Sequence, residues 1–176
     1  MRSVKVWDAI VRFTHWGVAL LFFANFMVID DDSPAHIYAG YALLALVAIR
    51  ILWGLVGSKY ARFSAFWPTP IRILAHLKGI FSSLPGVYLS HNPLGALMVL
   101  NLLATMIAIS ITGIMLTTRT FRFEDWVEEL HEGLAIYALV CVGIHVAGVL
   151  FDMKRSRINL IKAMVTGSKE IPEPTA

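Results

Sequence analysis

The sequence has few charged residues and almost no cysteine. Of 176 residues only 15% are charged and 57% are hydrophobic, against about 25% and about 45–50% in an average soluble domain. This composition excludes a disordered chain and disfavours an ordinary soluble globule. The one cysteine, Cys141, excludes an intrachain disulfide, a cysteine-ligated iron–sulfur cluster and the CxxCH attachment of a c-type haem.

The hydrophobic residues gather in four runs that are each long enough to cross a membrane. A bilayer core about 30 Å thick needs about 20 mostly apolar residues in a helix, and runs of this length without period-2 alternation predict helices. The predicted spans cover residues 9–29, 35–56, 94–116 and 131–151. The first run is too long for the apolar part of a secretory signal, so we expect it to be retained. The predicted fold class is an all-α integral membrane protein, a bundle of four transmembrane helices in a single domain over residues 1–167.

Two further segments lie outside these runs. Residues 62–84 carry a stripe at helical spacing, formed by Trp67, Ile71, Leu74, Lys78 and Phe81. We expect an amphipathic helix on the inner membrane surface there. Residues 168–176 are predicted to be a disordered cytoplasmic tail.

Basic residues fall almost entirely on one side of the predicted spans. Thirteen of the 15 Lys and Arg residues lie near the N-terminus, between spans 2 and 3, or near the C-terminus. The other side has two basic residues against eight acidic ones, namely Asp30, Asp31, Asp32, Glu124, Asp125, Glu128, Glu129 and Glu132. The positive-inside rule therefore predicts that both termini are cytoplasmic.

Four of the six histidines lie in or at the ends of spans: His15, His36, His131 and His145. Ionisable groups inside a bilayer are costly and usually functional. His131 and His145 are 14 residues apart on one span, about 21 Å along the axis and about 40° short of four full turns, so both project from nearly the same face. By depth, His36 matches His131 near the outer surface, and His15 matches His145 nearer the cytoplasm. The sequence predicts two pairs of facing imidazoles.

Paired imidazoles fit haem better than they fit zinc. Zinc usually needs a third or fourth ligand, and the third span has no His, Cys, Asp or Glu to supply one. Haem iron needs only two axial ligands, and two histidines leave one-electron transfer as the expected chemistry. Small residues near the ligands fit a flat macrocycle, although close helix packing uses glycine equally often; they are Gly17, Gly40, Gly133 and Gly148.

Other polar residues admit two interpretations each. Arg12 and Arg50 are candidate partners of haem propionates, and alternatively both extend to the lipid headgroups. His76 and His91 are expected to be exposed or at headgroup level, with proton handling at an inner quinone site as the alternative. The run at residues 30–32 indicates a solvated loop rather than a metal site, because three consecutive carboxylates are not expected to share a face.

With these positions in place, the chain resembles the bacterial four-helix di-haem cytochrome b family. This is the cytochrome b(561) type, related to the cytochrome b subunit of nickel–iron hydrogenases. The matching segments are VKVWDAIVRFTHW, HIYAGYALLALVAIRILWGLVGSKYARF, HNPLGALMVL and LHEGLAIYALVCVGIHVAG. The resemblance implies two non-covalent b-type haems, exchange of electrons with membrane quinone, and a place in the bacterial inner membrane. It carries axial ligation onto the pairs His15 with His145 and His36 with His131.

These features predict a transmembrane electron carrier between quinone and a periplasmic partner such as a c-type cytochrome. An acidic outer face suits a basic cytochrome, although a plain solvated surface is also acidic. A second hypothesis is a self-contained superoxide:quinone oxidoreductase, for which the resemblance implies an electropositive outer surface that this chain lacks. A third is a haem-free metal-binding or transport protein with four helices. The bilayer is the other expected partner; no nucleic acid is expected, and no residue is assigned a catalytic role.

Overall fold

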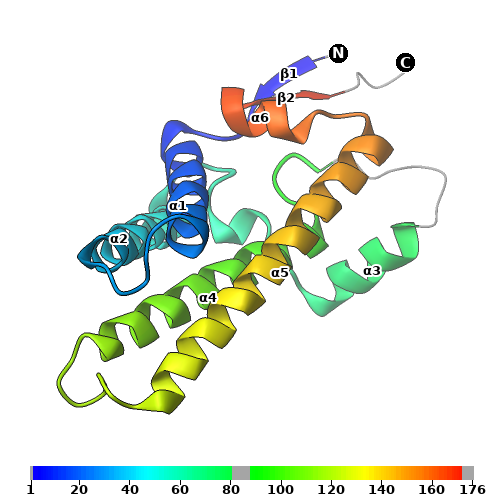
Figure 1. Cartoon of the computed structure of the whole chain (residues 1–176). Coiled ribbons are helices and arrows are strands. Elements are labelled where there is room, and N and C mark those ends of the chain that lie inside the picture. Colours follow the sequence, from blue (N-terminus) through cyan, green and yellow to red (C-terminus); the bar gives the residue numbers. More distant parts are fainter. Residues whose placement is uncertain (1, 81–87, 172–176) are drawn as a thin grey trace. The chain divides into compact units, whose positions relative to one another are not determined.

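The computed structural model describes residues 2–80 and 88–171, in which four helices are long and apolar enough to cross a membrane (Figure 1). They are α1 (Ala9–Met27), α2 (Pro34–Val56), α4 (Pro93–Leu116) and α5 (Asp125–Ser156). Large apolar side chains on them, such as Leu20 and Leu52, are more than half exposed, which a membrane tolerates and water does not. The four predicted spans are confirmed. Helix α5 is longer than its predicted span, and its 32 residues extend about 48 Å, beyond the hydrocarbon core.

Capping side chains fix where three of these helices begin. Asp8 precedes α1, Ser33 precedes α2 and Asn92 precedes α4, and each accepts a hydrogen bond from a backbone N–H in the first turn. Proline occupies the first position of α2 and of α4, where a backbone N–H would have no helical partner in any case. Helix α5 instead has acidic residues in its first turn and basic residues in its last turn, which complements the helix dipole.

The chain divides into two compact units. The terminal unit comprises Met1–Arg12, Leu52–Val99 and Ile144–Ala176, and the central unit comprises Phe13–Ile51 and Leu100–Gly143. The boundaries fall inside the four long helices, so each helix contributes residues to both units.

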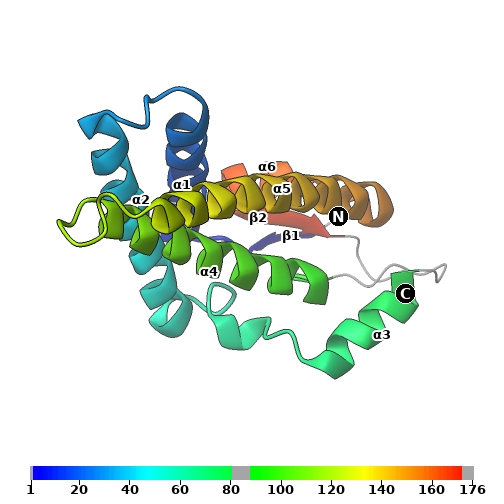
Figure 2. The same ribbon diagram turned by 60° about the horizontal axis from the view of Figure 1, so that its bottom comes forward.

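The central unit has one apolar core, formed by Phe22, Leu43, Val47, Met106 and Ala138. All four long helices contribute to it. Within this unit α4 and α5 run side by side after the turn that joins them, as both views show (Figures 1 and 2). This packing brings side chains of α4 against the first half of α5.

The terminal unit contains a small antiparallel sheet of β1 (Arg2–Lys5) and β2 (Ser168–Ile171), beside the short helix α6 (Leu160–Thr166) (Figure 1). Gly167 ends α6 with φ 90°, and its carbonyl accepts hydrogen bonds from the N–H groups of Val6 and Trp7. A Cβ at Gly167 would lie 2.6 Å from the Trp7 carbonyl oxygen. Glycine therefore satisfies both the left-handed conformation and the close approach.

The strand β2 occupies residues for which the sequence predicts the start of a disordered tail. Its pairing partner, β1, lies at the other end of the sequence, so no local sequence pattern predicts the strand. Residues 172–176 of the expected tail lie outside the described residues. Because β1 precedes α1 and β2 follows α5, their pairing joins the two ends of the segment that holds the four long helices.

The segment between α2 and α4 contains a 3₁₀ turn, η1 (Phe63–Ala65), and the helix α3 (Pro70–Ile80). Ile71, Leu74 and Leu77 of α3 are exposed, at spacings that share one helix face. This agrees with the predicted amphipathic helix, whose position on the inner membrane surface stays a prediction. The end of the predicted stripe, Phe81 to Leu84, lies outside the described residues.

Candidate functional site

His36 and His131 lie next to each other in the central unit. His36 is in the first turn of α2 and His131 is in the second turn of α5, and both side chains are half-buried. Their ring centroids are 6.2 Å apart, and the ring planes are inclined by 67°. The structure thus brings together two of the four predicted ligands.

The spacing of these two rings fits a metal ion held between them. A bond from a metal to an imidazole nitrogen is about 2 Å long, and the nitrogen lies about 1 Å from the ring centre, so ligation from both sides separates the ring centres by about 6 Å. Edge-to-face ring pairs in protein cores cover the same range of distances. The ring spacing alone therefore does not separate metal ligation from a simple edge-to-face contact, and the hydrogen bonds of the surrounding polar atoms are needed to do so.

Two polar atoms beside this ring pair lack a protein partner. Nδ1 of His36 and Oδ1 of Asn25 are buried, and neither has a hydrogen bond among residues 2–80 and 88–171. Asn25 adjoins the pair, because its Nδ2 donates to the backbone carbonyl of His36 at 3.3 Å. Most buried polar atoms in proteins are hydrogen-bonded. The two exceptions indicate room for a group that the chain itself does not supply, so the residues present fit a bound haem.

Helix α4 holds the His131 ring from its other side. The Thr112 hydroxyl oxygen lies 2.9 Å from Nδ1 of His131, and a Cβ at Gly113 would lie 3.1 Å from the ring carbon Cε1. Sequence reasoning missed both residues, since it searched α4 only for metal ligands. The signal that could have revealed Thr112 is a polar residue near the end of a nearly continuous apolar run.

The four glycines near the predicted ligands differ in their surroundings. A Cβ at Gly17 would lie 2.6 Å from Cδ1 of Leu46, so this glycine serves the close packing of α1 on α2. A Cβ at Gly40, Gly133 or Gly148 would meet nothing within 4 Å. Gly40 follows His36 by one turn and therefore lies on the same face of α2, where open space would admit a flat ring system.

Three residues of the central core lie seven positions from a predicted ligand on their own helix: Phe22 after His15, Leu43 after His36, and Ala138 midway between His131 and His145. Seven residues rise about 10.5 Å and fall about 20° short of two turns, so these side chains share the ligand face of each helix. Phe22 is 5% exposed, Leu43 4% and Ala138 0%. The level halfway along the α5 ligand face is therefore apolar and buried.

The other predicted pair is divided between the two units. His15 belongs to the central unit and His145 to the terminal unit, and both are half-buried. His15 packs edge-on against Trp16, with ring centroids 5.0 Å apart. The pairing of His15 with His145 stays a prediction.

Of the two predicted propionate partners, Arg50 is buried and Arg12 is half-buried. Arg50 is 7% exposed and follows His36 by 14 residues, the spacing that separates His131 from His145. Nη1 of Arg12 donates to the carbonyl of Val165 at 2.6 Å, whereas its buried Nε has no partner among the described residues. Contact of either side chain with a propionate stays a prediction.

A buried lysine lies in the terminal unit, within the segment expected to be disordered. Lys169 is 4% exposed, and its Nζ donates to the carbonyls of Ser90 at 2.8 Å and Tyr88 at 3.1 Å. The same Nζ lies 5.5 Å from the ring centre of Trp7. Burial lowers the pKa of Lys169 to about 8, against an opposing effect of the Asp152 carboxylate. No sequence signal marks this lysine, because its burial depends on the pairing of β2 with β1.

The two remaining histidines also lie in the terminal unit. The ring of His91 is half-buried, with its centroid 4.8 Å from that of Trp7 and 4.6 Å from that of Phe66. Nδ1 of His76 lies 3.2 Å from the Tyr88 hydroxyl. Burial lowers the pKa of His76, Asp152 raises it and Arg155 lowers it further, with a net decrease.

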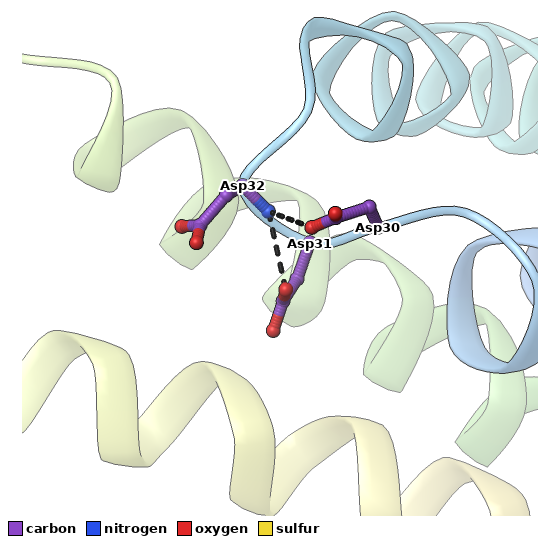
Figure 3. Close-up of side chains that lie close together, drawn as sticks. All are labelled: Asp30, Asp31 and Asp32. Carbon is purple, nitrogen blue, oxygen red and sulfur yellow. Dashed lines mark hydrogen bonds between the residues drawn. The ribbon is translucent and has the colours of Figure 1, made fainter.

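The three aspartates at residues 30–32 are closer together than the sequence suggests. One carboxylate oxygen from each lies within 4.8 Å of the others, because a turn carries them and the Asp32 N–H donates to both Asp30 and Asp31 at 3.1 Å (Figure 3). The expectation that they could not converge is wrong. All three are exposed, as in the solvated loop that was predicted.

The four long apolar helices and the half-buried histidines inside them define the class of multi-pass helical membrane proteins with imidazoles in their spans. Residues 6–167 match the family model of prokaryotic cytochrome b561, so the chain belongs to this family. No curated protein and no solved structure matches the chain. The family carries out transmembrane electron transfer with haem b, in the prokaryotic inner membrane. The predicted family and fold class are confirmed, and a haem-free transporter does not agree with them.

Proposed function

We propose that this protein carries electrons across the bacterial inner membrane, between quinone and a periplasmic redox partner, through two b-type haems with bis-histidine ligation. His36 and His131 would hold the outer haem, and His15 and His145 the inner one. The observation that supports the proposal most directly is the 6.2 Å spacing of the His36 and His131 rings beside polar atoms without protein partners. When bound, each haem would supply one-electron chemistry.

The chain's own residues position the cofactors and exclude water from the space between the two ligand levels. Helix α5 carries one ligand of each pair, 14 residues apart, which corresponds to about 21 Å in an α-helix. Phe22, Leu43 and Ala138 fill the level between them with apolar side chains. A dry, low-dielectric surround tunes the potential of a bound haem.

The orientation is supported by the distribution of charge. The N-terminal segment, the inner end of α2 with the segment that follows it, and the C-terminal segment carry 13 of the 15 basic residues, and the β1–β2 pairing agrees with an even number of crossings between the two strands. Positive charge stays in the cytoplasm, so the His36–His131 level faces the periplasm.

The outer end of the central unit suits a basic partner such as a c-type cytochrome. Asp30–Asp32 and the acidic residues from Glu124 to Glu132 are all exposed, and Phe123 beside them is 85% exposed. The acidic side chains attract a basic surface, and the exposed Phe123 ring, with the Arg122 guanidinium 5.5 Å from its centre, is available to contact that surface. The same charge repels superoxide, an anion, and so disfavours the alternative of a superoxide:quinone oxidoreductase. Rapid haem reduction by superoxide, with no partner protein added, would favour that alternative.

The proposal is tested by haem stoichiometry and redox titration of the protein purified in detergent. We expect two haems per chain and two one-electron steps. His145→Ala should leave one haem, whereas the control His91→Ala should keep both. Two haems retained in His145→Ala would contradict the ligand assignment, and a colourless wild-type preparation from a haem-sufficient host would contradict the function itself.

A further inference from the structure

Helix α4 supplies no ligand, yet it contacts one. Between Pro93 and Leu116 it has no His, Cys, Asp or Glu. At Thr112 and Gly113 it nevertheless meets the ring of His131. A helix that contributes no donor to the metal can still determine how a donor on its neighbour is presented.

The hydrogen bonds of Thr112 determine which nitrogen of His131 carries a proton. The Thr112 hydroxyl lies 3.1 Å from the carbonyl of Ala108 and 3.0 Å from the carbonyl of Ile109. Donation of its single hydrogen to either carbonyl, as threonine hydroxyls inside helices commonly do, leaves the hydroxyl oxygen to accept from Nδ1 of His131. Nδ1 therefore carries the hydrogen, and the lone pair is left on Nε2.

We propose that Thr112 is a positioning residue that fixes the tautomer of His131 and strengthens it as an axial ligand, which lowers the midpoint potential of the outer haem. Donation of Nδ1–H to an acceptor makes the imidazole a better electron donor, and a better donor favours ferric over ferrous iron. This inference rests on the proposed ligation by His36 and His131. It differs for the two ligands, because Nδ1 of His36 has no acceptor among the described residues.

Gly113 contributes space to the same arrangement. A Cβ there would lie 3.1 Å from Cε1 and 3.6 Å from Nδ1 of His131, which is tighter than ordinary van der Waals contact. Glycine lets the ring approach α4 closely enough for the 2.9 Å contact with Thr112. The two consecutive residues thus act together: Thr112 accepts the hydrogen bond, and Gly113 leaves space for the ring.

The test compares Thr112→Val with Thr112→Ser. Valine keeps the shape of threonine and loses the hydroxyl, whereas serine keeps the hydroxyl. Thr105→Val is the matched control, because Thr105 is similarly buried on α4 at 6% exposure and its hydroxyl donates to the Asn101 carbonyl. The measurement is a potentiometric titration of both haems, with the electron paramagnetic resonance spectrum of the ferric protein as a second readout.

We expect Thr112→Val to raise the ferrous-to-ferric ratio of the outer haem about threefold at a fixed potential, which is about 28 mV at 59 mV per tenfold change. The inner haem should not shift, and Thr112→Ser should titrate as the wild type. Loss of the outer haem in Thr112→Val alone would also support a positioning role. Unchanged potentials and spectra in Thr112→Val, or an equal shift in Thr105→Val, would overturn the inference. A wild type without two haems would instead refute the proposed function.

Discussion

The Asp8 carboxylate of the terminal unit and the polar atoms beside the His36–His131 pair of the central unit differ in whether the chain supplies their hydrogen bonds. In the terminal unit the Asp8 carboxylate accepts hydrogen bonds from Val11, Trp53 and Ser58, and these donors outweigh the effect of burial and lower its pKa. In the central unit, Nδ1 of His36 and Oδ1 of Asn25 are buried with no partner among the described residues. The hydrogen bonds of Asp8 indicate a structural role, whereas the unpartnered atoms beside the His36–His131 pair indicate space for a cofactor.

The largest expected effect is the loss of a haem from the central unit. His36→Ala removes a ligand at the 6.2 Å pair, and we expect haem content to fall from two per chain to one. His76→Ala is the control, since His76 lies in the terminal unit and contacts Tyr88. The measurement is the haem-to-protein ratio. Equal haem content in both variants would remove the distinction between the two units.

The second effect is a loss of stability in the terminal unit without a change in haem content. Lys169→Met leaves the carbonyls of Ser90 and Tyr88 without their donor, at a cost of about 1–3 kcal/mol in the free energy of unfolding. Lys162→Met is the control, because Lys162 forms only an exposed ion pair with Glu170 and should change stability by less than about 1 kcal/mol. Denaturant titration in detergent measures both. A lowered haem content in Lys169→Met would show that the units are not separable in this way.

The third effect is a dependence of stability on alkaline pH that arises from Lys169. Its pKa in the folded protein is about 8, against an ordinary value of 10.5. Between these values the unfolded chain binds more protons than the folded protein, so the contribution of Lys169 to stability rises with pH from about 8 to about 10.5. The thermal midpoint of the wild type should gain this contribution relative to Lys169→Met over that interval. Parallel pH profiles of the two proteins would show that the folded lysine titrates normally.

The smallest expected effect concerns the acidic surface of the central unit. Neutralising Glu124, Glu128 and Glu129 to Gln should weaken binding of a basic c-type cytochrome several-fold at low salt and leave little difference at high salt. Glu170→Gln, an exposed site in the terminal unit, is the control and should have no effect. Binding that is independent of salt in every variant would indicate that this surface is only solvated.

Much of this architecture could be predicted from residue spacing. The 14-residue interval on α5 places His131 and His145 on the same face of the helix, and Pro34 places His36 at the start of α2. The contact of Thr112 with His131 could not be predicted, because it depends on how α4 and α5 align across the turn between them. The burial of Lys169 could not be predicted either, since β2 and β1 have four residues each and lie at opposite ends of the sequence.

The pairing of β1 with β2 has a consequence for biogenesis. The ribosome makes β1 before these four spanning helices and β2 after them, so the sheet cannot close until all four helices have been inserted with the correct topology. If one of the four helices stayed outside the bilayer, β1 and β2 would lie on opposite sides of the membrane and could not pair. Protection of β1 from protease would therefore report that insertion is complete.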